Sequence, residues 1–234
     1  LFAFTFLPGI VVIAILLVVP EVREGSGSAL RNRSGGTGLT GDDDGTGFQP
    51  AVPPPLPADF YRLLGIILLF TLGNSTDAFL LLRLGEIGVP AAGIPLLWAG
   101  LHVIKSVGSA WGGALSDRLG RRWLIASGWL LYAAVYAGFA RVTSTPGLIA
   151  LFLVYGLYYG LSESPEKALI ADIIPSERRG TAFGIYNAAL GIGGLLASVA
   201  FGLVWTAAGA PAAFFLGATL AVAASVLLFT IRGG

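Results

Sequence analysis

The stretch Gly112-Gly-Ala-Leu-Ser-Asp-Arg-Leu-Gly-Arg-Arg122 separates two long apolar runs of the chain. Gly120 supplies the permissive backbone that a tight reversal between two helices requires. Gly113 would allow close approach of a neighbouring helix. Asp117 can face the positive N-terminus of an adjacent helix, while the arginines remain at the level of lipid headgroups. The stretch therefore predicts a short turn between two helices at a membrane surface.

Long apolar runs make up most of the chain on both sides of this turn. Hydrophobic residues account for 55% of the 234 residues and charged residues for only 12%, and mean hydropathy is +0.81. The runs lie at 1–19, 61–83, 95–115, 123–140, 147–171, 183–206 and 211–231. Each has about 18–25 residues, enough for a helix to cross a hydrocarbon core of about 30 Å. Because backbone polar groups in lipid must bond within their own segment, we expect an all-α, polytopic membrane helix bundle.

The composition also excludes several classes of protein. Net charge is +1, so the chain has no electrostatic footprint for nucleic acid. Cysteine is absent and His102 is the only histidine, which leaves no thiolate or histidine cluster for a metal or haem; we expect no cofactor and interpret His102 as a hydrogen-bonded packing residue. No P-loop, H-E-x-x-H or nucleophile elbow occurs, which argues against an enzyme. Methionine is absent and the chain begins inside an apolar run, so we expect a fragment of a longer protein.

The segment 21–58 differs in chemistry from the runs that flank it. It is rich in glycine and serine and ends in a proline cluster, which is typical of a flexible linker that stiffens into polyproline II. Asp42, Asp43 and Asp44 resemble part of a calcium loop, but the downstream glutamate of such a loop is missing. We therefore divide the chain into a transmembrane helix at 1–20, a linker at 21–58 and six helices at 59–234.

Basic residues are distributed unequally between the two sides of the expected bundle. If the helices alternate in direction, ten of the 14 Lys and Arg residues share one side: Arg23, Arg31, Arg33, Arg62, Arg118, Arg121, Arg122, Arg178, Arg179 and Arg232. The opposite side has Arg141, with Arg83 near its boundary. The positive-inside rule makes the side with ten arginines cytoplasmic, including the linker and the chain end. We expect an integral, multi-pass protein of a bacterial or archaeal plasma membrane.

The turn also resembles a loop signature of the major facilitator superfamily, G-x-x-x-D-R-x-G-R-R/K. Every position is matched, by Gly113, Asp117, Arg118, Gly120, Arg121 and Arg122. A second stretch, Asp172 to Gly184, resembles the P-x-x-x-R-G-x-x-x-G connection between the fifth and sixth helices of a half in this superfamily. The resemblance covers essentially all of 1–234.

The resemblance implies a definite place for this chain in a larger fold. Members of the superfamily have twelve helices in two six-helix halves, joined by a long cytoplasmic loop. The chain would then contain the sixth helix, the central loop and the C-terminal half; an N-terminal half would leave the first helix and the linker unexplained. The implied partners are the lipid bilayer, a small-molecule substrate and the N-terminal half of the same protein, in a monomer. Residues 112–122 would form a gating motif, and the helices 61–83 and 147–171 would line the central cavity.

Six ionisable residues fall within the runs: Asp77, Lys105, Glu163, Glu166, Lys167 and Asp172. Each would cost about 2.5–3.5 kcal/mol at a helix centre on insertion scales, so such residues usually face a cavity or a partner. Glu163 and Lys167 are i, i+4 neighbours and can pair. Lys105 can form a structural ion pair between helices or take a functional role, and both interpretations remain open.

Glu166 and Asp77 have no residue of opposite charge one turn away. A buried carboxyl group without a cation could load and release a proton, and Glu166 is the first candidate with Asp77 as the alternative. Pro165 should kink the helix beside Glu166. Asn74 shares a helix face with Asp77.

Aromatic and glycine residues complete the pattern. Several aromatic residues fall near helix ends or on packing faces, and we interpret most of them as interface anchors: Tyr155, Tyr158, Tyr159, Trp98, Trp111, Trp123, Trp129 and Trp205. Tyr159 and Tyr186 are candidates to line the cavity. The pairs Gly156/Gly160 and Gly180/Gly184 predict close helix packing.

The favoured function is secondary active transport of a small solute by alternating access, with coupling to protons as a further expectation. The alternatives are a transporter-like scaffold or receptor that moves no solute and, less favoured, a membrane-embedded enzyme. The sequence decides neither the substrate nor the direction of transport.

Overall fold

The computed structural model describes residues 55–231, and every regular element in this range is helical. The expected helix 1–20 and nearly all of the linker 21–58 lie outside the described residues. The elements are α2 (Ala58–Gly73), α3 (Ala78–Glu86), α4 (Ile94–Leu119), α5 (Arg121–Arg141), α6 (Thr145–Ile173), the 3-10 turn η2 (Ser176–Arg178), α7 (Arg179–Ala208) and α8 (Ala210–Leu228). The expected all-α fold class is confirmed.

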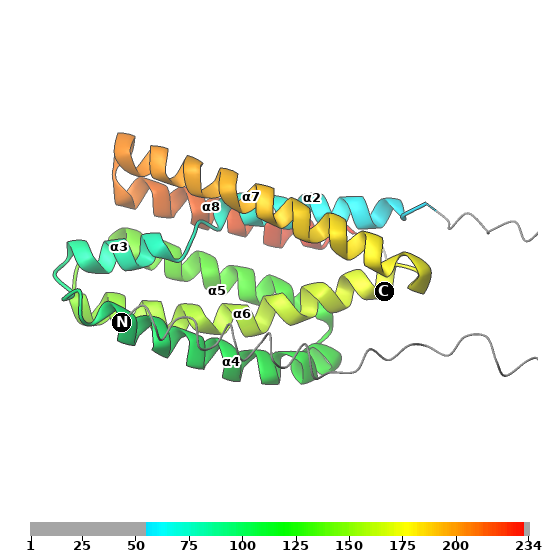
Figure 1. Cartoon of the computed structure of the whole chain (residues 1–234), viewed down its shortest axis with the longest axis horizontal. Helices are drawn as coiled ribbons and strands as arrows, with labels where there is room; N and C mark the ends of the chain where they lie inside the picture. Colours follow the sequence, from blue (N-terminus) through cyan, green and yellow to red (C-terminus); the bar gives the residue numbers. More distant parts are fainter. Residues whose placement is uncertain (1–54, 232–234) are drawn as a thin grey trace, which may run out of the picture. The chain divides into compact units, whose positions relative to one another are not determined.

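The helices run back and forth along a common direction (Figure 1). Five segments are long and apolar enough to cross a membrane: Ala58–Glu86, Arg121–Arg141, Thr145–Ile173, Ser176–Ala208 and Ala210–Leu228. One further long helix, α4, has 26 residues but is not among these five segments. His102, Lys105 and several glycines and serines lower the hydropathy of α4. α4 still packs closely along α6. His102 is exposed, and its Nδ1 lies 2.9 Å from the backbone oxygen of Trp98 on the same helix.

The buried core is centred on α5, which packs between α6 and α8. Trp129, Tyr132, Tyr136 and Phe139 of α5 are fully buried. By contrast, α7 contacts α2 and α8 and exposes a row of leucine, isoleucine and valine side chains. Such an outer face suits lipid, in which apolar side chains carry no cost of exposure.

The first described membrane crossing is interrupted, although the sequence predicted one continuous helix over 61–83. α2 ends at Gly73 and α3 begins at Ala78. The four residues between them are Asn, Ser, Thr and Asp, whose side chains compete with the backbone for hydrogen bonds. The carbonyl oxygen of Gly73 instead accepts a hydrogen bond of 2.8 Å from the Tyr132 hydroxyl. Irregular backbone at this depth is tolerated because it is enclosed by protein.

Glycines bring α4 and α6 into direct backbone contact, and we call this contact the glycine seam: Gly108 and Gly112 of α4 against Gly160 of α6. A Cβ atom at Gly112 or Gly160 would overlap the backbone of the other helix. The packing expected at Gly160 is confirmed, but Gly112 rather than Gly113 makes the close approach. Within residues 55–231, a Cβ at Gly113, Gly180 or Gly184 would meet nothing within 4 Å, so packing at these three positions is not observed.

Candidate functional site: a polar pocket between α2, α4, α6 and α7

The turn that carries the arginine motif joins α4 to α5 as predicted. Gly120 has φ of 86°, in the left-handed region that favours glycine. The Arg121 guanidinium lies 2.8 Å from the carboxylate of Asp172 at the end of α6. The Arg122 guanidinium donates a 2.7 Å hydrogen bond to the backbone oxygen of Ile231, beyond α8. The turn is thereby attached to two other helix ends, and Asp172, expected inside the membrane run, is an exposed partner of Arg121.

The contact expected between the Asp117 carboxylate and the N-terminus of an adjacent helix stays a prediction. Asp117 is exposed in the last turn of α4, as is Arg118. Within residues 55–231, the Asp117 carboxylate forms no ion pair.

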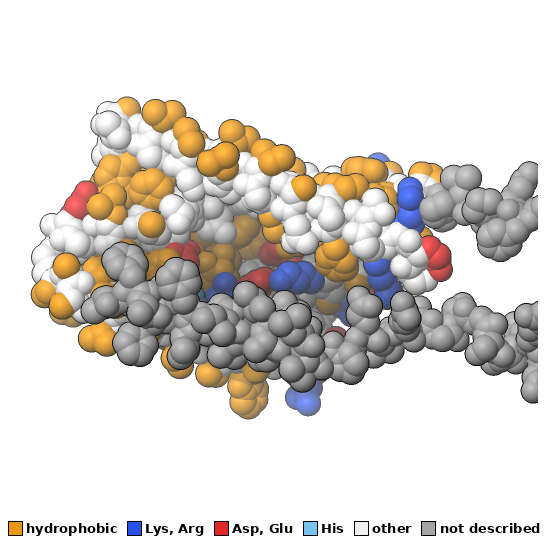
Figure 2. Space-filling view, in the orientation of Figure 1, with side chains coloured by type: hydrophobic (Ala, Val, Ile, Leu, Met, Phe, Trp, Pro, Cys, Tyr) orange, Lys and Arg blue, Asp and Glu red, His pale blue; other side chains and the backbone are white. Residues whose placement is uncertain are grey.

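A polar pocket of about 250 Å³ lies among α2, α4, α6 and α7. Figure 2 shows acidic and basic side chains in the hollowed face beside α7, in contrast to the apolar surface above them. The lining residues are Phe70, Thr71, Asn74, Lys105, Tyr158, Tyr159, Ser162, Glu163, Glu166, Lys167, Tyr186, Asn187 and Leu190. The sequence offers six candidates for a cavity or for proton coupling: Asn74, Asp77, Lys105, Glu163, Glu166 and Lys167. All of them except Asp77 line this pocket.

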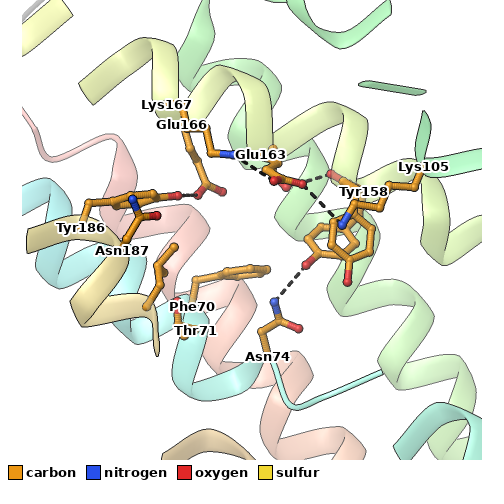
Figure 3. A pocket seen from close by; sticks show the side chains of 13 residues that line it. Phe70, Thr71, Asn74, Lys105, Tyr158, Glu163, Glu166, Lys167, Tyr186 and Asn187 are labelled. Atoms are coloured by element: carbon orange, nitrogen blue, oxygen red, sulfur yellow. Dashed lines mark hydrogen bonds and ion pairs between the residues drawn. The ribbon is translucent and has the colours of Figure 1, made fainter. Parts of the chain in front are cut away.

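One wall of the pocket holds a cluster of three charges, which we call the charge cluster: Lys105, Glu163 and Lys167 (Figure 3). The Lys167 ammonium lies 3.0 Å from Oε1 of Glu163, as the i, i+4 spacing predicted. The Lys105 ammonium, from α4, lies 3.6 Å from Oε2 of the same carboxylate. It also lies 3.7 Å from the centre of the Tyr159 ring, a cation–π contact. The structure thus gives Lys105 an interhelical ion pair on the surface of the pocket.

Glu166 has a different environment from the charge cluster, although it follows Glu163 by one turn of α6. Its side chain is buried, with 6% exposure. Trp129 Nε1 donates a 3.0 Å hydrogen bond to Oε1, and the Tyr186 hydroxyl donates one of 3.3 Å to Oε2. No lysine or arginine within residues 55–231 is within ion-pair distance of Glu166. α6 runs through Pro165 without interruption.

Asp77 lies behind the pocket wall, at the N-terminus of α3. Its carboxylate accepts a hydrogen bond of 2.6 Å from the Tyr155 hydroxyl and bonds of 2.9 and 3.1 Å from the Tyr159 hydroxyl. Tyr159 also lines the pocket, so it separates Asp77 from the cavity. Nearby, Asn74 donates a 2.9 Å hydrogen bond to the Tyr158 hydroxyl.

The interpretation of most aromatic residues as interface anchors does not hold for three of them. Trp129, Tyr155 and Tyr158 are buried and form hydrogen bonds with Glu166, Asp77 and Asn74, respectively. Their spacing contained a usable signal. Tyr155, Tyr158, Tyr159, Ser162 and Glu166 lie at i, i+3, i+4, i+7 and i+11, which places them on one face of α6.

The chain is similar in sequence to membrane transporters. The profile of the Major Facilitator Superfamily matches residues 63–233. An uncharacterised MFS-type transporter of Methanocaldococcus jannaschii is 31% identical over 182 residues, which cover 75% of this chain and 46% of that protein. The quinolone resistance protein NorA of Staphylococcus aureus is 29% identical over 135 residues, covering 54% of this chain and 35% of NorA. The chain thus spans less than half the length of these relatives.

A solved structure shares the fold. The crystal structure of the POT family transporter PepTSo matches with a TM-score of 0.64 and 17% sequence identity, over 76% of this chain and 38% of that one. At this identity, the likeness concerns the arrangement of helices alone.

Proposed function

Because the chain belongs to the Major Facilitator Superfamily, we propose that it forms the C-terminal half of a secondary transporter that moves a small solute by alternating access. The observation that carries the proposal is the polar pocket, in which ionisable side chains of α4 and α6 lie inside an otherwise apolar bundle. Charges within a membrane are costly and are retained where they face a partner or a transport path. The family is one of transporters rather than enzymes.

The proposal includes an orientation and a partner. The N-terminal half of the same protein would supply the facing wall of the pocket. The end of the bundle that carries Arg62, Arg121 and Arg178 would be cytoplasmic, since basic residues favour that side. A bacterial or archaeal plasma membrane fits this asymmetry.

We further propose proton coupling through Glu166. It is buried, and its two partners are neutral donors from α5 and α7. Without a cation to hold the charge, such a carboxyl group can change its protonation state when the pocket changes its exposure to water. Asp77 is the second candidate because its partners are also neutral.

Alternating access can be tested by cysteine labelling without knowledge of the solute, since this chain has no cysteine of its own. The complete protein without the substitution gives the background labelling from any thiol of the other half. Asn187→Cys places a thiol on the pocket wall of the complete protein. We expect this thiol to react with a membrane-impermeant reagent added from either side, in vesicles of each orientation. Reaction from one side only would favour the non-transporting scaffold.

The orientation has its own markers. Leu119→Cys and Glu177→Cys mark the basic end, and Ala91→Cys and Thr143→Cys mark the other; all four positions are exposed. The connecting glycines 88, 120 and 209 are avoided because their positive φ angles disfavour a side chain. Leu119 and Ala91 labelled from the same side would contradict the proposed topology.

A further inference from the structure

The charge cluster is arranged as a clamp around one carboxylate. Each oxygen of Glu163 has its own ammonium group, from Lys167 on α6 at 3.0 Å and from Lys105 on α4 at 3.6 Å. Two lysines from different helices therefore converge on a position that a carboxylate fills. In the described chain, that carboxylate is supplied by the protein itself.

The charge that faces the pocket is positive. The side chains of Lys105, Glu163 and Lys167 are 35%, 40% and 49% exposed, so all three are accessible from the cavity. Glu166, the other acid of the pocket, is buried and bound by Trp129 and Tyr186. Among the described residues 55–231, the accessible charged groups of the pocket are thus two cations and one anion, which leaves one positive charge in excess.

The rest of the lining is suited to an apolar or aromatic body. Phe70, Tyr158, Tyr159 and Leu190 line the same pocket. The Tyr159 ring also holds the Lys105 ammonium by its face at 3.7 Å, which orients that lysine toward Glu163. Aromatic and aliphatic walls with a few convergent polar groups are typical of a small-molecule site.

We propose that this pocket binds an organic anion, a carboxylate with an apolar or aromatic body, whose carboxylate replaces that of Glu163 between Lys105 and Lys167. The inference rests on the proposed transport function and names its substrate class. Displaced Glu163 is partly exposed and can be hydrated, so the exchange leaves no buried charge unpaired. A cationic ligand would instead have to draw Glu163 away from both lysines and lie beside two uncompensated ammonium groups.

Three matched probes test the substrate class on the wild-type complete protein in detergent or nanodiscs. They are 4-phenylbutyrate, 4-phenylbutylamine and 4-phenylbutanol, which share a phenyl ring and a four-carbon chain and carry an anionic, a cationic and a neutral head group. Isothermal titration calorimetry should show that the carboxylate binds about tenfold or more tightly than the other two, as the clamp discriminates by charge. Tighter binding of the amine, or equal binding of all three, would overturn the proposal.

Substitutions of the lysines and of the glutamate in the charge cluster should change the affinity for 4-phenylbutyrate in opposite directions. Lys105→Gln and Lys167→Gln should each weaken 4-phenylbutyrate binding about tenfold, and arginine at either position should restore most of it. Glu163→Gln should strengthen binding several-fold, because it removes the internal competitor. Weaker binding of the anion to Glu163→Gln contradicts the proposed exchange. Arg62→Gln, which removes an exposed charge paired with Asp59 outside the pocket, is the matched control and should change nothing.

The failure of this inference is distinguishable from failure of the transport function. Labelling of Asn187→Cys reports access and requires no ligand. If Asn187→Cys is labelled from both sides but the protein binds 4-phenylbutylamine more tightly than 4-phenylbutyrate, the anion site is wrong and the transport function stands. If Asn187→Cys is labelled from one side only but 4-phenylbutyrate binds most tightly, the transport function is wrong and the anion site stands.

Discussion

Two regions around the pocket hold carboxylates in opposite ways. In the charge cluster, Glu163 is half-exposed and lies between two ammonium groups. In the aromatic region, Glu166 and Asp77 are held by hydroxyl and indole donors, and no cation within residues 55–231 pairs with either. We call this region the aromatic shell, and it consists of Trp129, Tyr155, Tyr159 and Tyr186.

The difference suggests a division of tasks between neighbouring turns of one helix. An ion pair open to water can exchange partners with a charged ligand, because both states are solvated. A carboxyl group within an aromatic shell has no competing ion, so the exchange available to it is of a proton. Ligand and proton would then use separate carboxylates within a single pocket.

The largest effect is expected from removing the acid in the aromatic shell. Glu166→Gln should abolish transport driven by a pH gradient in vesicles while 4-phenylbutyrate still binds, because the amide cannot carry the proton. Glu163→Gln, one turn away, should retain a response to the gradient. If Glu166→Gln keeps the wild-type pH response and Asp77→Asn loses it, Asp77 is the carrier; if both keep it, coupling through this half is wrong.

The donors of the shell should contribute to stability. Trp129→Phe keeps a ring stacked near Phe70, whose centroid lies 4.7 Å away, but removes the N–H that binds Glu166. We expect a loss of about 2–3 kcal/mol in unfolding free energy, since a buried acceptor loses its best donor. Thermal unfolding in detergent measures the change. Trp123→Phe is the control, at a position that is 68% exposed. An equal loss of unfolding free energy in Trp123→Phe would show that the hydrogen bond to Glu166 is not the cause of the loss in Trp129→Phe.

Removing one tyrosine hydroxyl beside Asp77 should lower the unfolding free energy less than Trp129→Phe does, because the other tyrosine still donates a hydrogen bond to the carboxylate. Tyr155→Phe removes a hydrogen bond of 2.6 Å and Tyr159→Phe removes bonds of 2.9 and 3.1 Å. We expect each to cost about 1–2 kcal/mol, and the double variant to lose more than the sum. Strict additivity in a double-mutant cycle would show that the two hydroxyls act independently.

The smallest effect on stability is expected in the charge cluster. Lys105→Gln removes a half-exposed pair at 3.6 Å, which should be worth about 0–1 kcal/mol and should shrink further at high salt. The same variant is expected to weaken anion binding markedly. A large loss of stability would instead assign Lys105 to the structural role that the sequence left open.

The outline of the fold was predictable because a bilayer imposes one length and one kind of hydrogen bonding on every crossing. Runs of apolar residues therefore correspond closely to α5, α6 and α8. The break between α2 and α3 was not predicted, since it depends on the Tyr132 hydroxyl of α5, which donates a hydrogen bond to the free carbonyl oxygen of Gly73. Hydropathy reports the polarity of a segment and not which neighbour satisfies its backbone.

The site was predictable only where its contacts are local. The Glu163–Lys167 pair follows from helical spacing, whereas Lys105 reaches Glu163 through the packing of α4 on α6. Likewise, Trp129 and Glu166 are 37 residues apart, and nothing in either segment alone specifies their hydrogen bond. Contacts of this kind depend on the rotation of each helix about its axis, which a single sequence constrains weakly.

The glycine seam has a consequence for the thermodynamics of binding. The backbones of α4 and α6 are so close there that a Cβ atom at Gly112 or Gly160 would overlap the other helix. Lys105 lies one turn from Gly108 and Glu163 one turn from Gly160, so both lie beside this close contact. A ligand that enters between the lysines therefore meets a preorganised site and orders few side chains on arrival. Its affinity should carry a small entropic penalty, and the motion that exposes it to either side of the membrane should displace α4 and α6 together.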